Sequence, residues 1–475
     1  MQLKKVFCLL LSLSSLLTTI KGQQVSIFAG SWEGKLNVGM ELRVVFHIKE
    51  EKGVFSSTVD SPDQDAFGIG TDATTVSGND IKIEMGDLKA VFEGKMVNDS
   101  TIEGEFTQGV ALPLTLTRTT KVQKAPLRPQ LPVPPFPYKS EDVTYTNTDK
   151  TITFGATITI PEGKGPFPAV LLITGSGPQD RDESLMGHKP FAVLADHLTR
   201  KGFVVLRTDD RGTNKSTGDF NKATSADFAE DAEAGVNYLI SRTETDPKKV
   251  GLIGHSEGGM IAPMVAAKRK DIGFIVLMAG PGVPVIELMA EQNAAILRSG
   301  GVDTDAANGI KDAFKTLAQH IISAPTKEEA LAGSVKITED WAARQSPQML
   351  KDLELETPEK RKVYVTQMVI SFQTPWFQYF MKFNPEIYLE KLSCKILAIN
   401  GSEDVQVISS QNLPGIEKSL KKSKSKNYEI KELAGLNHLF QRCNTCTVEE
   451  YSKLEETMAP EALDTISNWL LKNVK

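Results

Sequence analysis

The sequence predicts an α/β domain that carries a helical insertion and follows a small all-β domain. Three patterns support this prediction. Between about residues 24 and 118, apolar and polar side chains alternate with period two, as they do in half-buried strands. From residue 140 onward, short continuous apolar runs alternate with helical stretches, which is typical of a parallel sheet covered by helices. Between residues 283 and 392 the strand pattern stops and helical periodicity takes over.

The composition narrows the class of protein. A chain of 475 residues is too long for one ordinary hydrophobic core, so more than one domain is expected. Apolar residues make up 40% and charged residues 24%, as in soluble globular proteins. The net charge of −6 disfavours a nucleic acid or an anionic membrane as a partner, because both are bound through basic surfaces. No stable membrane insertion is expected. The oligomeric state is left open.

The first 22 residues have the pattern of a secretory signal peptide. Lys4 and Lys5 precede the apolar run Val6–Leu17, and the small residue Gly22 follows a short polar stretch. The run is too short to span a bilayer comfortably. We therefore expect residues 1–22 to be removed and the protein to be periplasmic or secreted. A retained anchor or a buried N-terminal helix is the alternative.

Three cysteines follow the predicted signal peptide: Cys394, Cys443 and Cys446. An oxidising compartment permits a Cys443–Cys446 disulfide, and two free thiols are the alternative. A single C-x-x-C pair without clustered histidines is poor evidence for zinc. We therefore predict no metal site.

Residues 23–120 are predicted to form a β-sandwich or barrel-like domain. Leu42–Ile48 and Leu112–Leu116 alternate apolar with polar residues, and Gly, Asn and Asp turns separate such segments. Trp32 is expected in the core. Residues 121–139 contain six prolines, which provide no backbone donor and fix φ. That segment is predicted to be an extended, fairly stiff linker.

Residues 140–475 are predicted to form the α/β domain. Its expected buried strands are Ala169–Ile173, Phe203–Leu206, Val250–Ile253, Phe274–Met278 and Ile396–Ile399. Its expected helices include Ala192–Lys201, Ala226–Ile240 and the closing Pro460–Val474. The insertion, residues 283–392, contributes Val285–Arg298, Ala306–Ile321 and Glu359–Phe372. We interpret the insertion as a cap over the carboxyl edge of the sheet.

The strongest motif is Gly254-His255-Ser256-Glu257-Gly258, which fits G-x-S-x-G. It directly follows the strand Val250–Ile253 and precedes the helical run Met260–Lys268. Such a tight strand-to-helix turn holds a serine hydroxyl above the sheet, next to a helix N-terminus that favours negative charge. This context predicts an α/β-hydrolase fold with Ser256 as its nucleophile.

A serine nucleophile needs a base that is oriented by an acid, and in this fold the order is Ser, Asp or Glu, then His. His438 follows the strand-like Tyr428–Leu433 and is predicted to be the base. His320 lies in a helical stretch of the cap and is interpreted as structural. Asp404 follows the strand Ile396–Ile399 and is the predicted acid, with Glu403 as the alternative.

Two backbone N–H groups are expected to stabilise the oxyanion. One belongs to Glu257, the residue after the nucleophile. The other is assigned to Ser176 in the small-residue turn Thr174–Pro178, where the backbone approaches substrate closely. The charged segments 180–182 and 209–212 follow strand ends, and we interpret them as ion pairs that brace these loops. Substrate binding is the alternative.

Several segments resemble a branch of bacterial α/β-hydrolases described as secreted esterases or serine aminopeptidase-like hydrolases. They are GSGPQDRDE (175–183), GHKPFAVLADHLTR (187–200), 209–220, GHSEGG (254–259) and LNHLFQ (436–441). The N-terminal β module beginning SWEG is similar to one found ahead of such hydrolases. The resemblance implies a triad of Ser256, Asp404 and His438 and carboxylesterase activity on small acyl esters. Thr213-Asn214 departs from the family, where a glycine commonly stands.

The predicted activity is therefore hydrolysis of a small-molecule carboxylic ester through an acyl-enzyme, with no cofactor. The aromatic residues Trp376, Phe377, Tyr379 and Phe380 are candidate pocket walls, although a plain helical core explains them equally well. A serine exopeptidase with the same triad is the alternative. A non-enzymatic binding module is disfavoured by the intact Ser-Asp-His order.

Overall fold

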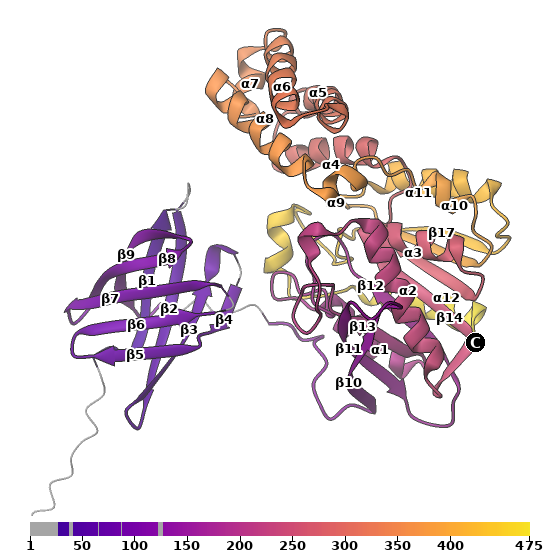
Figure 1. Ribbon diagram of the computed structural model, residues 1–475, viewed down its shortest axis with the longest axis horizontal. Coiled ribbons are helices and arrows are strands. Elements are labelled where there is room, and N and C mark those ends of the chain that lie inside the picture. Colours follow the sequence, from indigo (N-terminus) through magenta and orange to yellow (C-terminus); the bar gives the residue numbers. More distant parts are fainter. Residues whose placement is uncertain (1–26, 38–40, 65, 87, 122–126) are drawn as a thin grey trace, which may run out of the picture. The chain divides into compact units, whose positions relative to one another are not determined.

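The computed structural model describes residues 27–475 except 38–40, 65, 87 and 122–126, so the predicted signal peptide lies outside the described residues. The chain divides into two compact units, residues 1–125 and 126–475 (Figure 1). The division falls within the proline-rich segment 121–139. Each unit has a hydrophobic core of its own.

The first unit is one antiparallel sheet of nine strands, in the order β4-β3-β2-β1-β9-β8-β7-β6-β5. The strands are β1 Gly30–Asn37, β2 Glu41–Glu51, β3 Val54–Ser61, β4 Ala66–Gly70, β5 Ala73–Ser77, β6 Asp80–Met85, β7 Ala90–Asn98, β8 Thr101–Gln108 and β9 Val110–Thr119. A 3-10 turn, η1 Pro62–Gln64, precedes β4. The Ser57 hydroxyl on β3 lies 2.7 Å from that of Thr74 on β5, so the sheet curls until its ends meet. Trp32 is fully buried in its core.

The second unit contains an eight-stranded sheet in the order β10-β11-β13-β12-β14-β15-β16-β17. The strands are β10 Tyr138–Thr146, β11 Thr153–Pro161, β12 Phe167–Ile173, β13 Val204–Thr208, β14 Thr245–His255, β15 Ile272–Met278, β16 Lys395–Gly401 and β17 Tyr428–Leu433. The first two are antiparallel to their neighbours, and the last six are parallel. The central strands are buried on both faces, which explains their continuous apolar runs.

Helices cover both faces of this sheet. On one face lie α1 Pro190–Arg200 and α12 Pro460–Asn473. On the other lie α2 Ser225–Ser241, α3 Glu257–Lys268 and α11 Ser409–Lys422. Two 3-10 turns, η2 Phe220–Lys222 and η3 Val448–Lys453, lie in connecting loops. This arrangement, with a nucleophile turn between β14 and α3, is the α/β-hydrolase fold that the sequence predicts.

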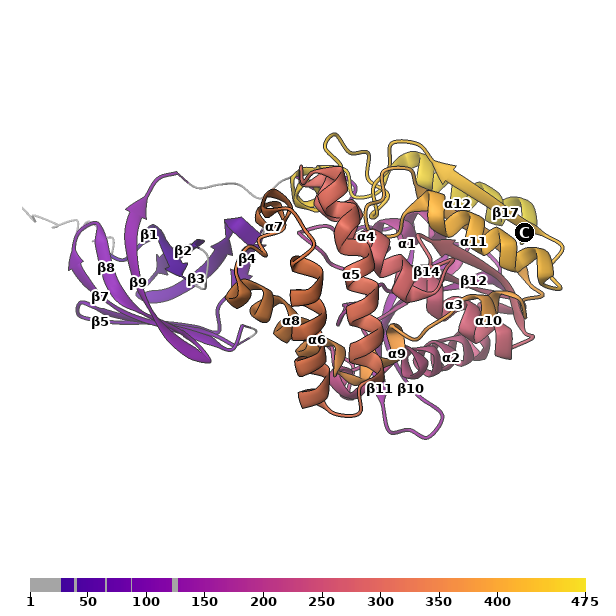
Figure 2. The same ribbon diagram turned by 90° about the horizontal axis from the view of Figure 1, so that it is seen from above.

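The insertion between β15 and β16 is helical throughout its regular structure. It comprises α4 Val285–Ser299, α5 Thr304–Ser323, α6 Lys327–Ala342, α7 Pro347–Asp352, α8 Pro358–Phe372, α9 Pro375–Phe380 and α10 Glu386–Leu389. In Figures 1 and 2, α5 to α8 lie away from the sheet, whereas α4 and α9 lie nearer its carboxyl edge. Among the described residues, no helix combines the length and apolar character needed to cross a membrane.

The last part of the proline-rich segment, residues 127–137, belongs to the second unit. The Arg128 guanidinium donates to the carbonyls of Met186, Ser452 and Leu454 at 2.7–3.0 Å. The Gln130 side-chain oxygen accepts from two successive amides of the loop before α12. We call residues 127–137 the strap, since these bonds hold it on the α/β unit.

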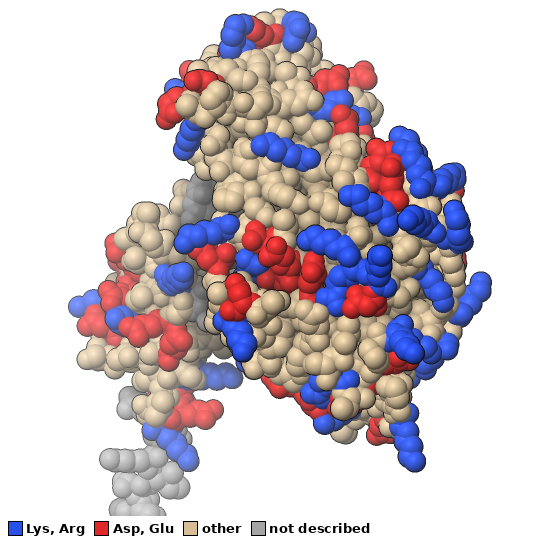
Figure 3. All heavy atoms as spheres, turned by 45° about the vertical axis from the view of Figure 1, so that its right-hand side comes forward, with Lys and Arg blue, Asp and Glu red and all other residues tan. Residues whose placement is uncertain are grey.

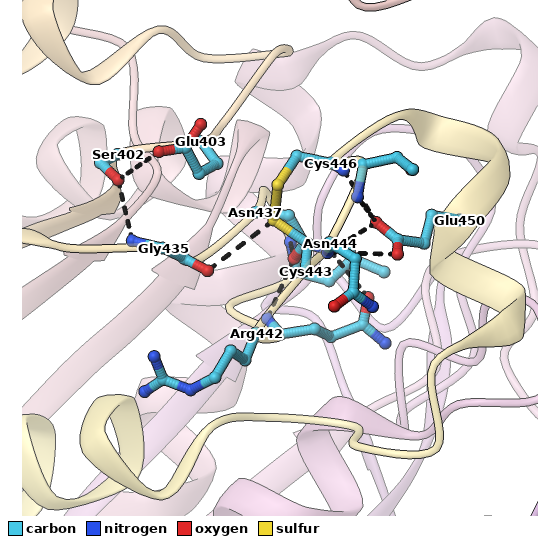
Figure 4. Close-up of a disulfide and its surroundings, with 12 residues drawn as sticks. Ser402, Glu403, Gly435, Asn437, Arg442, Cys443, Asn444, Cys446 and Glu450 are labelled. Carbon is cyan, nitrogen blue, oxygen red and sulfur yellow. Dashed lines mark hydrogen bonds between the residues drawn. A yellow bond between two sulfur atoms is a disulfide. The ribbon is translucent and has the colours of Figure 1, made fainter.

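Cys443 and Cys446 form a disulfide in the loop after β17 (Figure 4). The Glu450 carboxylate accepts hydrogen bonds from the backbone amides of Asn444, Thr445 and Cys446 at 2.8–3.1 Å. The described residues contain one cluster with metal-ligand spacing, formed by Cys443, Cys446 and Glu450. Its sulfurs are joined to each other and its carboxylate is already bonded to backbone, so it does not fit a metal ion.

Candidate active site

Ser256 lies between β14 and α3 with φ 52° and ψ −114°. A non-glycine residue with positive φ is strained, and here the strain lifts the side chain above the strand end. The Ser256 N–H donates to the Met278 carbonyl of the neighbouring strand at 2.9 Å. This geometry is that of a nucleophile elbow.

The glycines of G-x-S-x-G are required by close backbone packing. A Cβ on Gly254 would lie 2.0 Å from the Gly258 carbonyl oxygen, and one on Gly258 would lie 2.1 Å from that of Ile173. Either contact is far inside van der Waals distance. A larger residue at either place would therefore push α3 away from the sheet and displace Ser256.

His438 and Asp404 are brought together from two loops at the same sheet edge. The Nδ1 of His438 lies 2.8 Å from Oδ2 of Asp404, and both residues are buried. The other oxygen of Asp404 accepts from the amides of Gln406 and Val407 at 2.8 Å. Because the carboxylate is fixed on both sides, it orients the imidazole with Nε2 available for a reaction.

The two alternatives from the sequence lie elsewhere. Glu403 is exposed, and its carboxylate accepts from the Ser402 hydroxyl at 3.0 Å. His320 is on α5, where its Nε2 lies 3.3 Å from the Glu329 carbonyl. Neither lines the cavity described below.

Ser256 and His438 line one cavity of about 240 Å³. Ser176 and Glu257, the predicted oxyanion donors, also line it, and neither backbone N–H has an acceptor among the described residues. The remaining walls are mostly apolar and come from the cap, the sheet edge and the His438 loop. They are Pro281, Leu288, Met289, Trp376, Phe377, Phe380, Val407 and Leu439, with Gly175, Gln179, Glu183, Leu185, His255, Gln292 and Gln406.

Three of the four predicted wall aromatics, Trp376, Phe377 and Phe380, lie at this cavity, and Tyr379 does not. All four are on the short helix α9. Trp376 stacks on Phe380 with ring centroids 4.6 Å apart. Tyr379 does not line the cavity, and burial together with a hydrogen bond to Tyr388 raises the pKa of its hydroxyl.

The side chain of Glu257 has contacts that sequence reasoning did not foresee. Its Oε1 accepts from the Ser225 hydroxyl at 2.5 Å and from the Trp376 indole N–H at 2.8 Å. Burial raises the pKa of Glu257, and hydrogen bonds from Ser225, Trp376 and Ser176 oppose that shift. The carboxylate thus connects the nucleophile helix to α2, to the oxyanion turn and to the cap. No local sequence signal marks these contacts, since the partners are far apart in the chain.

The charged segments beyond two strand ends form ion pairs. Arg181 pairs with Asp209 at 2.6 Å, Arg207 pairs with Asp182, and Arg211 pairs with Asp231 at 2.6 Å. The first pair joins the loops after β12 and β13, the second joins the loop after β12 to β13 itself, and the third joins the loop after β13 to α2. On the face drawn in Figure 3, lysines and arginines are interspersed with aspartates and glutamates.

The family model described as X-Pro dipeptidyl-peptidase (S15 family) matches residues 150–422. The chain belongs to this family. The match covers the nucleophile elbow, the cap and Asp404, but ends before His438. Together with the fold, membership of the S15 family makes this protein a serine hydrolase of the α/β-hydrolase type.

Curated relatives of this S15 family member include esterases and peptidases. Esterase EstD of Thermotoga maritima is 30% identical over 281 residues, 59% of this chain and 60% of that protein. Mouse acyl-coenzyme A thioesterase 5 is 28% identical over 34% of this chain and 35% of its own. Human dipeptidyl peptidase 8 is 35% identical over 25% of this chain and 13% of its own. The chain therefore spans less than two thirds of each of these relatives.

Solved structures with a similar chain course include an esterase from Pyrococcus furiosus. It is 16% identical to this chain with a TM-score of 0.42, and the match covers 74% of this chain and 99% of that one. A hypothetical protein from Pseudomonas aeruginosa is 16% identical with a TM-score of 0.44, covering 75% and 99%.

Proposed function

We propose that this protein hydrolyses small, uncharged carboxylic esters through Ser256, His438 and Asp404. His438 takes the hydroxyl proton as Ser256 attacks the ester carbonyl, and Asp404 stabilises the imidazolium that forms. The amides of Ser176 and Glu257 stabilise the oxyanion, each contributing roughly 3 kcal/mol. His438 then protonates the departing alcohol, and water releases the acid from the acyl-enzyme.

The observation that carries this proposal is the composition of the cavity. Its walls are mainly apolar, and no lysine or arginine is among the described residues that line it. Oε1 of each of its two carboxylates already has partners, Glu183 with His255 and the Gly175 amide, and Glu257 with Ser225 and Trp376. Because the walls are mainly apolar and both carboxylates are partly engaged, this lining favours uncharged esters over a substrate that carries an ammonium group.

Active-site variants test the assignment. On a p-nitrophenyl acyl ester we expect Ser256→Ala and His438→Ala to lower kcat by about 10⁶-fold and Asp404→Ala by about 10⁴-fold, as in other triad hydrolases. The matched control is Glu403→Ala, which removes the neighbouring exposed carboxylate and should leave kcat unchanged. Labelling by a fluorophosphonate should disappear in Ser256→Ala and remain in the control Glu403→Ala. Full activity of Ser256→Ala would refute the mechanism.

The second candidate is an exopeptidase, which membership of the S15 family favours. Parallel assays with the p-nitrophenyl ester and with aminoacyl and X-Pro p-nitroanilides separate the two. We expect the ester to have the higher kcat/KM. A higher kcat/KM for an anilide would replace the ester proposal by a peptidase that uses the same residues.

We also propose that the protein is exported. The signal-peptide pattern of residues 1–22 supports this, and the Cys443–Cys446 disulfide suits an oxidising compartment. N-terminal sequencing of protein recovered from cell fractions tests it. A mature chain that begins near Gln23 outside the cytoplasm is expected, and an uncleaved cytoplasmic chain would refute it.

A further inference from the structure

A second buried histidine–carboxylate pair lies beside the catalytic residues and has no part in the mechanism above. His255 is the last residue of β14 and immediately precedes the nucleophile, and Glu183 lies in the loop after β12. Each is 5% exposed. The Nδ1 of His255 lies 2.9 Å from Oε1 of Glu183. A buried charged pair costs desolvation free energy, so its contacts call for an explanation.

The pair bonds to both halves of the catalytic machinery. The same Glu183 Oε1 accepts from the amide of Gly175 at 2.7 Å, next to the oxyanion donor Ser176. On the other side, Nε2 of His255 lies 3.0 Å from the backbone carbonyl oxygen of His438. One continuous chain of hydrogen bonds therefore runs from the oxyanion turn to the backbone of the base.

The partners of His255 determine its protonation. A carbonyl oxygen only accepts, and so does an ionised carboxylate. With Glu183 ionised, both ring nitrogens donate, which makes the ring an imidazolium. Burial acts to lower the pKa of His255, but the charge and hydrogen bond of Glu183 and the hydrogen bond to His438 outweigh it, so the pKa is raised. Charge-assisted hydrogen bonds are about twice as strong as neutral ones.

Ring packing adds a second restraint. The rings of His255 and His438 have centroids 4.8 Å apart at an angle of 43°, and Phe440 lies against His255 at 6.2 Å. Glu183 is itself held at φ 52°, a conformation that surrounding contacts must maintain. The His438 ring is thus supported by Asp404 on one side and by His255 on another.

We propose that His255 and Glu183 are positioning residues that hold the His438 backbone and the Gly175–Ser176 turn at a fixed separation across the nucleophile. This inference rests on the proposed function, because it assigns the pair to the reaction of Ser256. The pair touches no reacting atom. The pair keeps His438 and the oxyanion donors correctly placed relative to each other. Its loss therefore weakens the stabilisation of the transition state and leaves substrate binding unchanged.

The test separates kcat from KM. His255→Phe retains ring volume and removes both donors. We expect it to lower kcat for the p-nitrophenyl ester by about 100-fold, the cost of a misplacement of about 1 Å, with KM unchanged. Glu183→Gln keeps an acceptor for the Gly175 amide and removes the charge, so a smaller loss is expected. The double variant should match His255→Phe alone, because the two residues act as a unit.

Rates are normalised to active sites titrated with a fluorophosphonate, so that misfolded protein is not counted. His255→Gln, which can donate one hydrogen bond to the His438 carbonyl, should recover part of the lost kcat and serves as the second variant where the phenylalanine variant does not fold. The control is His197→Phe on α1, where Nε2 bonds to Ser467 and the residue does not line the cavity. It should leave kcat unchanged.

Unchanged kcat in His255→Phe and His255→Gln, or independent losses that multiply in the double variant, would overturn the positioning role. So would a raised KM with kcat intact. These outcomes leave the Ser256→Ala result untouched, so they reject the positioning role alone. Full ester hydrolysis by Ser256→Ala would instead refute the proposed function and the positioning role together.

Discussion

At the scale of single residues, two buried histidines of the α/β unit have pKa values shifted in opposite directions. The pKa of His255 is raised from its ordinary 6.5 because Glu183 and the His438 carbonyl outweigh the effect of burial, with a further contribution from Asp404. The pKa of His188 is lowered to about 4 by burial and by the charge of Arg128. Folding therefore favours the charged form of His255 and the neutral form of His188.

These shifts predict opposite pH dependences of stability. Because the pKa of His255 is higher in the folded than in the unfolded state, its protonation stabilises the fold fully below pH 6.5. That stabilisation is lost as the pH rises through the pKa of the folded state. For His188 the unfolded state binds more protons between pH 4 and 6.5, so stability is lost as pH falls across that window.

We therefore expect the difference in free energy of unfolding between wild type and His255→Gln to shrink above pH 6.5. His188→Gln should reduce the acid-induced loss of stability between pH 6.5 and about 4. Denaturant titrations at a series of pH values measure both. Parallel curves for wild type and both variants would contradict the assigned charge states.

At the scale of elements, the short helix α9 connects the cap to the nucleophile helix. The Trp376 indole donates to Glu257, the first residue of α3. Trp376→Phe keeps apolar surface and removes the donor, at a cost of about 1 kcal/mol. If α9 thereby loosens over the cavity, KM for acyl esters rises about fivefold with kcat unchanged.

Tyr379→Phe is the matched control, because Tyr379 is on the same helix and does not line the cavity. It should leave KM unchanged. Steady-state kinetics over a series of acyl chain lengths compares the two variants. Equal changes in KM, or a loss confined to kcat in Trp376→Phe, would show that α9 is not a wall of the acyl site.

The regular elements were predictable because their signals are local. The strand Tyr428–Leu433 has the predicted bounds, and the predicted helix Val285–Arg298 differs by one residue. The pairing of Asp404 with His438 at one sheet edge was also predictable, since each residue follows a strand end. The bonds Glu183–His255 and Trp376–Glu257 were not, because they join residues 72 and 119 positions apart. Such contacts depend on how loops pack and leave no periodic pattern.

At the scale of the whole molecule, the α/β unit begins before the first strand of its sheet, because the strap is bonded to this unit. The sheet begins with β10 at Tyr138, but Arg128 and Gln130 are bonded to the loop between η3 and α12. That loop follows the His438 segment, where Gln441 bonds to the Glu456 carbonyl. The strap therefore supports the loop that in turn supports the base.

Two truncations separate the strap from the β unit. A chain that begins at Leu127 retains Arg128 and Gln130 and should keep the stability and kcat of the α/β unit. A chain that begins at Tyr138 loses both residues. Since a hydrogen bond from a charged group contributes about 1.5–3 kcal/mol, its free energy of unfolding should fall by about 3 kcal/mol or more. Arg128→Ala in the full-length chain should reproduce most of that loss. If both truncated chains unfold at the same denaturant concentration, the strap contributes nothing to the unit, and the proline-rich segment is a linker along its whole length, as its composition predicts.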